Sequence, residues 1–405
     1  MKRILFHESS LNGKVGGSHH SLLLIIKNLD PTKYEKMVVL NSDVALRPEF
    51  ENVCKVLIWE GPSASYFAGL GARQGWNTKF CNWPTPIGKP ANFVYCSSRM
   101  FYNDILLGAT VIRKYYHLLK REKIDLLHLN NSFDTYWSLA AMLAGVPLVQ
   151  HVRGVSGSLS SPLRNYPVKV ICISDCIKQN VLARGVDARK VVRIYNAVDC
   201  QTFRPNRNSH ELRAEFGLQD SDYVVSLFGN IQKWKGQEVL LRACARLKER
   251  HKNLKCVLFG EIIEEGYAKE LKRLADVLEL KNSFHFAGFK KENADWMNAS
   301  DVIVHTSILP EPFGRVLIEA MSLGKPVIGT NLGAVPEIVE DRESGLLFAA
   351  GNDEQLAAHI DFLLKNPHEA EQLGRSAIQR VKQLFDVRQH IEAIQNLYKS
   401  ILNGD

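Results

Sequence analysis

Two glutamates, Glu311 and Glu319, flank a stretch in which a proline-bounded loop passes into a helix near Gly314. The first backbone N–H groups of a helix lack partners and carry partial positive charge, so they can bind an anion such as a diphosphate. Glu319, inside the helix, can accept hydrogen bonds from a ribose, and Glu311, on the loop, from a second polyol. The same spacing also arises by chance, with one glutamate on a loop and one on a helix surface.

These side chains need a rigid scaffold of strands and helices. The sequence predicts such a scaffold, because apolar runs alternate with helical stretches along the chain. Continuous apolar strands separated by helices are typical of a parallel sheet that is covered on both faces. We expect strands at 4–6, 37–40, 125–129, 147–150 and 168–172, then at 223–228, 254–260, 283–286, 302–304 and 326–328. We expect helices at 18–29, 237–250, 266–279 and 387–403.

The length of 405 residues is sufficient for two α/β domains of about 200 residues each. The polar stretch 202–210 places the boundary between them near residue 200, so we expect domains at 1–200 and 201–386. No run of 18 apolar residues predicts a transmembrane helix, and the apolar run at 4–6 is too short for a signal peptide. We therefore expect a cytoplasmic protein.

The patterns of cysteine and charge limit the kinds of metal ion or molecule that this chain is expected to bind. None of the eight cysteines forms a Cys-x2-Cys pair, which predicts free thiols and no metal site. The net charge of +8 is uneven, since residues 1–200 carry +11 and residues 201–405 carry −3. A basic first half favours an anionic partner, for which a membrane surface, a phosphorylated acceptor and a nucleic acid are candidates.

The segment 50–125 interrupts the alternation of strands and helices. It is rich in aromatic residues and ends in a basic amphipathic stretch at 113–123. Aromatic rings and cations on one surface are what binding to an anionic membrane requires. The alternative is a helix that packs inside the domain and leaves a solvated basic face.

Several short motifs resemble those of one known family. Residues 229–236 read Gly-Asn-Ile-Gln-Lys-Trp-Lys-Gly, and further matches lie at 16–17, 173–175, 195–199, 203–205 and 324–339. With the two glutamates, they resemble glycosyltransferase family 4 over most of the chain, least clearly at 50–125. The resemblance implies the GT-B fold, in which two Rossmann-like, doubly wound parallel-sheet domains face each other across a cleft. It also implies that 201–386 binds a nucleotide-sugar donor, and that 1–200, completed by 387–405, binds the acceptor.

The resemblance assigns catalytic roles to Lys235, Glu311 and His151. Lys235 would bind the leaving diphosphate, Glu311 would hold the donor sugar, and His151 would reach that sugar from the first domain, with His128 as a competing candidate. Family members usually carry an arginine five residues before Lys235, where this chain has the uncharged Asn230.

Other donor contacts implied by the resemblance come from Glu319, which would bind the ribose, and from loop and helix-start residues. These are Gly16, Gly17, Gly229, Asn230, Phe313, Gly314, Val316 and Leu317. Lys233, Arg315 or Arg153 could supply the positive charge that Asn230 lacks.

We therefore expect a retaining hexosyltransferase that moves a sugar from a nucleotide-diphosphate sugar, UDP-linked rather than GDP-linked. The acceptor would be a glycan or lipid-linked precursor of a cell-surface polysaccharide or glycolipid, with the protein peripheral on the inner face of the membrane. No cofactor or metal is expected. Since no side chain stands out as a nucleophile, the family's front-face route is expected, in which the leaving phosphate oxygen helps to take the acceptor proton.

Two alternatives remain. The first is a nucleotide-sugar epimerase or hydrolase of the same fold. The second is a non-enzymatic protein that binds a membrane or nucleic acid, although no nucleic-acid module signature is present, so no nucleic-acid partner is expected. A nicotinamide dehydrogenase is disfavoured, because neither 4–6 nor 225–227 leads into Gly-x-Gly-x-x-Gly.

Overall fold

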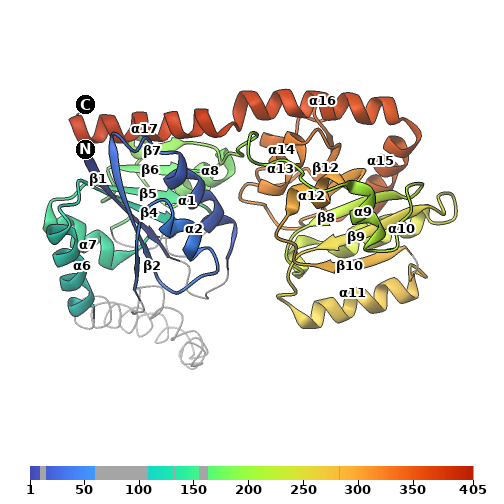
Figure 1. Cartoon of the computed structure of the whole chain (residues 1–405), viewed down its shortest axis with the longest axis horizontal. Helices are drawn as coiled ribbons and strands as arrows, with labels where there is room; N and C mark the ends of the chain where they lie inside the picture. The colour runs from blue at the N-terminus through green and yellow to red at the C-terminus, as the bar shows by residue number, and fades with distance from the viewer. Residues whose placement is uncertain (10–14, 60–107, 132, 155–162, 282, 405) are drawn as a thin grey trace, which may run out of the picture. The chain divides into compact units, whose positions relative to one another are not determined.

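The computed structural model describes residues 1–9, 15–59, 108–131, 133–154, 163–281 and 283–404 (Figure 1). The chain folds into two compact units. The first holds Met1–Ile173, Ile177–Ile194 and Ile391–Asp405, and the second holds Ser174–Cys176 and Tyr195–His390. The last helix, α17 (Val387–Asn403), thus begins in the second unit and ends in the first.

A parallel sheet of seven strands lies at the centre of the first unit, in the order β3-β2-β1-β4-β5-β6-β7. The strands are β1 (Lys2–Glu8), β2 (Tyr34–Leu40), β3 (Lys55–Ile58), β4 (Leu126–Asn131), β5 (Leu148–Val152), β6 (Lys169–Cys172) and β7 (Val191–Arg193). β4 and β5 are buried along almost their whole length, because helices cover both faces, as their uninterrupted apolar runs predict.

Within the described residues, the helices of this unit are α1 (Gly17–Asn28), α2 (Arg47–Glu51), α6 (Ala109–Arg121), α7 (Thr135–Ala144) and α8 (Asp175–Ala183), with a 3-10 turn η3 (Ala188–Lys190). α6 buries its apolar face in a core shared with α7, where the rings of Tyr115 and Trp137 stack 3.8 Å apart. Its cations Arg113, Lys114, Lys120 and Arg121 are exposed. Most of the aromatic residues of the segment 50–125 lie outside the described residues.

The second unit is built on a parallel sheet of six strands, in the order β10-β9-β8-β11-β12-β13. The strands are β8 (Tyr223–Phe228), β9 (Leu254–Phe259), β10 (Phe284–Gly288), β11 (Val302–His305), β12 (Val327–Thr330) and β13 (Leu346–Phe348). The helices are α9 (Ser209–Ala214), α10 (Gln237–Leu247), α11 (Glu265–Val277), α12 (Asn293–Asn298), α13 (Arg315–Ser322), α14 (Val335–Ile338), α15 (Asp353–Lys365) and α16 (Pro367–Leu384). A 3-10 turn, η4 (Lys233–Lys235), precedes α10.

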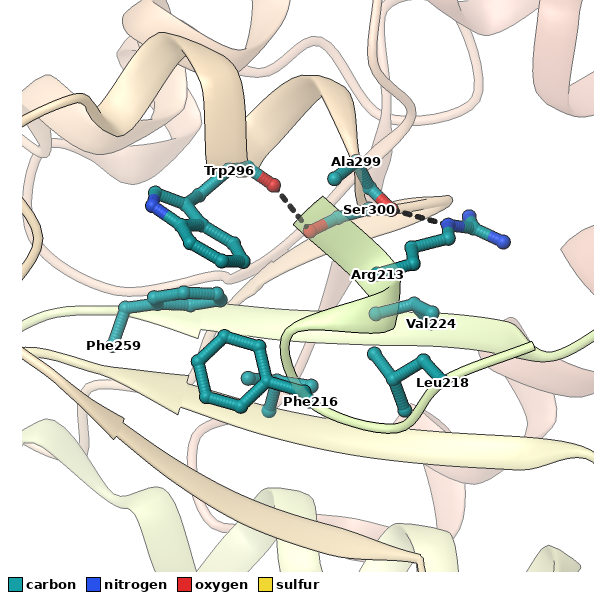
Figure 2. Close-up of a pocket in the computed structure, with 9 residues that line it drawn as sticks. Arg213, Phe216, Leu218, Val224, Phe259, Trp296, Ala299 and Ser300 are labelled. Carbon is teal, nitrogen blue, oxygen red and sulfur yellow. Dashed lines mark hydrogen bonds between the residues drawn. The ribbon is translucent and has the colours of Figure 1, made fainter. Parts of the chain in front are cut away.

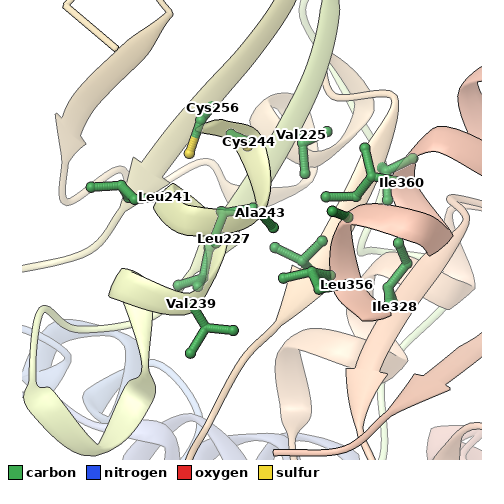
Figure 3. Packing of buried hydrophobic residues seen from close by; sticks show 14 of the residues in the cluster. Val225, Leu227, Val239, Leu241, Ala243, Cys244, Cys256, Ile328, Leu356 and Ile360 are labelled. Carbon is green, nitrogen blue, oxygen red and sulfur yellow. The ribbon is translucent and has the colours of Figure 1, made fainter. Parts of the chain in front are cut away.

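The main core of the second unit joins β8 and β9 to the helices α10 and α15. Figure 3 shows Leu227 and Cys256 from the strands against Ala243 of α10 and Leu356 and Ile360 of α15. Burial raises the pKa of the Cys256 thiol well above its ordinary value, so this cysteine behaves as a small apolar side chain. The six cysteines within the described ranges are all free thiols.

Both sheets reverse their strand order at the same place, between the first and fourth strands of each unit: β1 and β4, then β8 and β11. In open α/β sheets, ligands bind beyond the carboxyl ends of the strands at this reversal. The prediction of two doubly wound parallel-sheet domains is confirmed, and every strand expected from the sequence is present. Three short strands, β3, β7 and β13, were not expected. Within the part of the chain that the structure describes, none of the helices combines the length and hydropathy that crossing a bilayer requires.

Candidate functional site

The loop after β8 brings Lys235 to the reversal point of the second sheet. Gly236 has φ +64°, and a Cβ there would overlap with the carbonyl oxygen of Thr306, just beyond β11. Thr306 Oγ1 donates to the carbonyl of Lys235 at 2.8 Å, and the amide of Ile308 donates to the carbonyl of Trp234 at 2.8 Å. The two loops are therefore held together by backbone contacts that no side chain larger than hydrogen at Gly236 would permit.

Glu311 stands opposite Lys235 and forms a compact polar cluster. Lys235 Nζ lies 2.7 Å from Glu311 Oε2, which also accepts hydrogen bonds from His305 Nε2 at 3.0 Å and Ser307 Oγ at 3.1 Å. The Lys235 ammonium also lies 4.1 Å from the ring centroid of Trp234. Oε1 of Glu311 has no hydrogen-bond donor among the described residues, so it is available to a ligand hydroxyl.

The electrostatics keep Glu311 charged. Burial alone raises the pKa of this carboxyl, but the charge of Lys235 and the hydrogen bond from His305 outweigh burial and hold the pKa well below its ordinary value. A half-buried lysine beside a buried glutamate, with one carboxylate oxygen unoccupied, can bind an anion and a hydroxyl group side by side.

This lowered pKa predicts how acid affects the Lys235–Glu311 pair. Its contribution to folding is present above the unfolded pKa of about 4.3 and is lost as pH falls toward the lower folded value. We expect Glu311→Gln to lower the free energy of unfolding by about 1–3 kcal/mol at pH 6, and by clearly less at pH 3. Urea denaturation at both pH values measures this, with Glu249→Gln, which removes the exposed pair with Lys252, as the control. A difference that grows on acidification would contradict the assignment.

Helix α13 begins at the predicted place, directly after Gly314. Gly314 adopts φ +104°, and Phe313 is buried against the rings of Tyr195 and Phe385. Among the residues that the structure describes, the amides of Gly314 and Val316 have no hydrogen-bond acceptor, as the anion-binding prediction requires.

The Leu317 amide differs from its two neighbours at this helix start. This N–H group donates to the carbonyl of Gly314 at 3.0 Å, because the first turn of α13 closes there with an i to i−3 hydrogen bond. The binding of a donor by Leu317 stays a prediction.

Glu319 is buried on the inner side of α13 and pairs with Arg315, whose Nη2 lies 2.6 Å from Oε1. Burial raises the pKa of Glu319, and the opposing charge of Arg315 reduces this effect without cancelling it. Arg315 is thus already paired with a carboxylate in its own helix. The binding of a ribose by Glu319 stays a prediction.

The loop after β8 also holds the predicted residues Gly229, Asn230 and Lys233, and a close backbone approach between two glycines fixes its first part. Asn230 lies beside Gly229, and a Cβ on Gly260, at φ +146°, would overlap with the Gly229 backbone. The carbonyl of Asn230 accepts a hydrogen bond from Gln237 Nε2 at 2.9 Å. Lys233 is exposed on the same turn.

In the first unit, Gly16 and Gly17 lie where α1 begins, in the connection that follows β1. The amide of Gly16 donates to His19 Nδ1 at 3.2 Å, and a Cβ on Gly16 would meet nothing within 4 Å. The space beside this helix start is therefore open among the described residues.

His151 lies on β5 within a chain of buried polar side chains. His151 Nδ1 contacts His128 Nε2 at 3.2 Å and Arg153 Nη2 at 3.3 Å. Arg153 Nε donates to Asn130 Oδ1 at 2.5 Å, and His128 Nδ1 contacts the hydroxyl of Tyr398 at 2.5 Å. His128, predicted as a competitor of His151, is its hydrogen-bonded neighbour, and which of the two reaches the sugar stays a prediction.

The sequence reasoning did not find four members of these clusters. These are buried polar residues that contact predicted site residues or their direct partners, namely Asn130, His305, Ser307 and Tyr398. For Asn130 and His305 a signal existed, since both stand at the carboxyl end of an apolar strand. Tyr398 carried no such signal, because it lies in a helix 270 residues from its partner His128.

A separate cavity in the second unit is mostly apolar. Figure 2 shows Phe216, Phe259 and Trp296 around it, and the hydroxyl of Ser300 donates to the carbonyl of Trp296 at 2.9 Å. Val224 and Ser300 place part of its wall near the amino ends of β8 and β11, whereas the candidate site follows their carboxyl ends. Arg213 also lines the cavity, but its guanidinium already donates to the carbonyls of Ala299 and Asp222 and pairs with Asp301 at 2.9 Å.

Two family models match this chain, one in each of its two halves. Residues 208–380 match the model for glycosyl transferases group 1, and residues 72–202 match the model for glycosyltransferase family 4. The chain belongs to glycosyltransferase family 4. In this family 4 protein, the group 1 match contains Lys235, Glu311 and Glu319, and the other match contains His128 and His151.

Named relatives and solved structures agree with this assignment. Spore coat protein SA of Bacillus subtilis is 29% identical over 301 residues, which are 69% of this chain and 80% of that protein. D-inositol 3-phosphate glycosyltransferase 2 of Catenulispora acidiphila is 32% identical over 203 residues, 48% of this chain and 47% of that protein. HepE of Anabaena, solved in complex with UDP and glucose, is 25% identical with a TM-score of 0.78, covering 99% of this chain and 100% of that one. The protein is thus a glycosyltransferase with the GT-B fold.

Proposed function

We propose that this glycosyltransferase moves a hexosyl group from a UDP-sugar to a glycan or lipid-linked acceptor, with retention of anomeric configuration. The observation that carries the proposal is the Lys235–Glu311 pair, 2.7 Å apart at the reversal point of the second sheet. The likeness to HepE, which binds UDP and glucose, supports the choice of a UDP-sugar. The product would be a precursor of a cell-surface polysaccharide or glycolipid.

The residues of the second unit suit the chemistry of such a donor. Negative charge develops on the diphosphate as the bond to the sugar breaks, and Lys235 Nζ with the amides of Gly314 and Val316 would stabilise that charge. Glu311 Oε1 would accept hydrogen bonds from the sugar hydroxyls and fix the orientation of the ring. The acceptor hydroxyl then attacks the anomeric carbon on the side that the leaving group occupied, and the leaving phosphate oxygen takes its proton.

A panel of nucleotide sugars tests the donor assignment. We expect one or more UDP-sugars to raise the melting temperature, because ligand at 100 times its Kd stabilises the fold by about 2.7 kcal/mol. GDP-sugars should have little effect. The anomeric configuration of the product, followed by proton NMR during turnover, should match that of the donor. An inverted product, or stabilisation by GDP-sugars alone, would refute the corresponding part of the proposal.

Incubation with the donor alone separates the transferase from an epimerase or hydrolase of the same fold. An epimerase would convert the nucleotide sugar without any acceptor, and a hydrolase would release free sugar at the rate of transfer. We expect neither at a comparable rate, and we expect EDTA to leave the rate of transfer unchanged. Within the described ranges, no group of three His, Cys, Asp or Glu side chains is placed to hold a metal ion.

We further expect electrostatic binding to anionic membranes through the exposed cations of α6. Because the apolar face of α6 is buried in the first unit, this attraction would act through charge rather than through insertion of the helix. Lys120→Gln with Arg121→Gln should weaken binding to phosphatidylserine vesicles by about 10–30-fold at low salt. Lys252→Gln with Lys281→Gln removes two exposed cations from the second unit as a control. Equal loss in both double variants, or equal binding to neutral vesicles, would contradict the assignment to α6.

A further inference from the structure

The hydrogen bonds around His151 determine where each proton of this buried chain resides. His128, His151, Asn130 and Tyr398 are fully buried, and Arg153 is 8% exposed. An arginine side chain has only donors, so Arg153 Nη2, 3.3 Å from His151 Nδ1, can only donate to that nitrogen. His151 Nδ1 therefore carries a lone pair and no proton.

The same reasoning assigns the proton of His128. Its Nε2 lies 3.2 Å from His151 Nδ1, and two lone pairs facing each other at this distance would repel. His128 Nε2 must therefore carry a proton and donate it to the same acceptor.

Tyr398 completes the chain on the far side of His128. Its hydroxyl lies 2.5 Å from His128 Nδ1, and burial raises its pKa well above the ordinary value, so it keeps its proton. If His128 carried two protons, the hydroxyl proton of Tyr398 would have no acceptor among the described residues. Tyr398 therefore donates to His128 Nδ1, and His128 is neutral. The donors thus converge on His151 Nδ1, from Arg153 on one side and from Tyr398 through His128 on the other.

We propose that Arg153, His128 and Tyr398 are positioning residues that hold His151 as a neutral imidazole with its single proton on Nε2. In this state His151 is a hydrogen-bond donor through Nε2, and its one basic lone pair, on Nδ1, already accepts from Arg153 and His128. The consequence for catalysis rests on the proposed function: His151 donates to an oxygen of the sugar substrate and takes no proton from the acceptor hydroxyl. That proton goes to the leaving phosphate oxygen instead.

The tautomer is measurable without any substrate. Long-range proton–nitrogen correlation spectra of the histidine-labelled protein distinguish imidazoles protonated on Nε2 from those protonated on Nδ1. The chain has 13 histidines, so spectra of His128→Gln and His151→Gln assign the two signals by their loss. We expect both rings to carry the proton on Nε2. A His151 ring protonated on Nδ1, or on both nitrogens at neutral pH, would overturn the proposal, whatever the donor or acceptor of the reaction.

A mutant cycle tests whether the chain acts through His151. Tyr398→Phe removes one hydrogen bond and should lower kcat for transfer by about fivefold and populate the other tautomer of His128. In a background that already carries His151→Ala, the same change should cost almost nothing further, because its target is absent. Tyr34→Phe, which removes a hydroxyl but keeps the ring packed edge-on 6.0 Å from Tyr398, is the matched control and should leave kcat and both histidine signals unchanged. Additive losses in the cycle would show a merely structural role for Tyr398 and refute the proposal.

Discussion

Replacing Lys235 with methionine is expected to reduce kcat for sugar transfer by about 10²–10³-fold, with the second unit still folded. Methionine keeps the length of the side chain and removes the ammonium group that lies 2.7 Å from Glu311. The effect should be large because the cation is fixed before the reaction, by the Glu311 carboxylate and the Trp234 ring, where charge would develop on the leaving group.

Loss of the lysine also leaves the Glu311 carboxylate less well paired, so stability and catalysis must be separated. Thermal melts identify the folded variants, and Lys235→Met combined with Glu311→Gln removes the unpaired charge. Lys252→Met disrupts the Lys252–Glu249 pair, which is also a lysine–glutamate contact but is fully solvated, and should leave kcat unchanged. A folded Lys235→Met protein with unaltered kcat would reject the proposed role of this lysine.

Substituting Gly333 with alanine is expected to destabilise the second unit by about 2–4 kcal/mol. Gly333 follows β12 with φ +64°, and a Cβ there would overlap with both the amide nitrogen and the carbonyl oxygen of Glu311. Backbone atoms cannot rotate away as a flexible side chain can, and the amide of Ala334 holds the same carbonyl at 2.9 Å. The substitution should therefore displace Glu311 and lower transfer even in the folded fraction.

The control for this prediction is Gly351→Ala. Gly351 has a similar φ of +79°, but a Cβ there would meet nothing within 4 Å, so the substitution measures the backbone cost alone, about 1–2 kcal/mol. Urea denaturation of both variants gives the difference that arises from contact with Glu311. Equal destabilisation of the two variants would show that close packing against Glu311 is not what Gly333 provides.

Much of the second unit could be predicted from the sequence, because its strands and the site residues that follow them are marked by short patterns of neighbouring residues. Lys235 and Glu311 each stand a few residues beyond a buried apolar strand, and parallel strands bring their carboxyl ends to one edge of the sheet. The start of α13 was also predicted, since a proline-bounded loop and Gly314 precede it. The short edge strands β3, β7 and β13 were missed because three or four residues carry too little periodicity to be distinguished from loop.

The sequence by itself determined that this chain is a two-domain α/β glycosyltransferase of family 4, because apolar strands and short motifs can be recognised from neighbouring residues alone. Only the tertiary structure decided which distant residues become partners, such as Lys235 and Glu311, or Tyr398 and His128. The physical reason is that a proton position or a shifted pKa depends on atoms within about 4 Å, and folding brings those atoms from any distance along the chain.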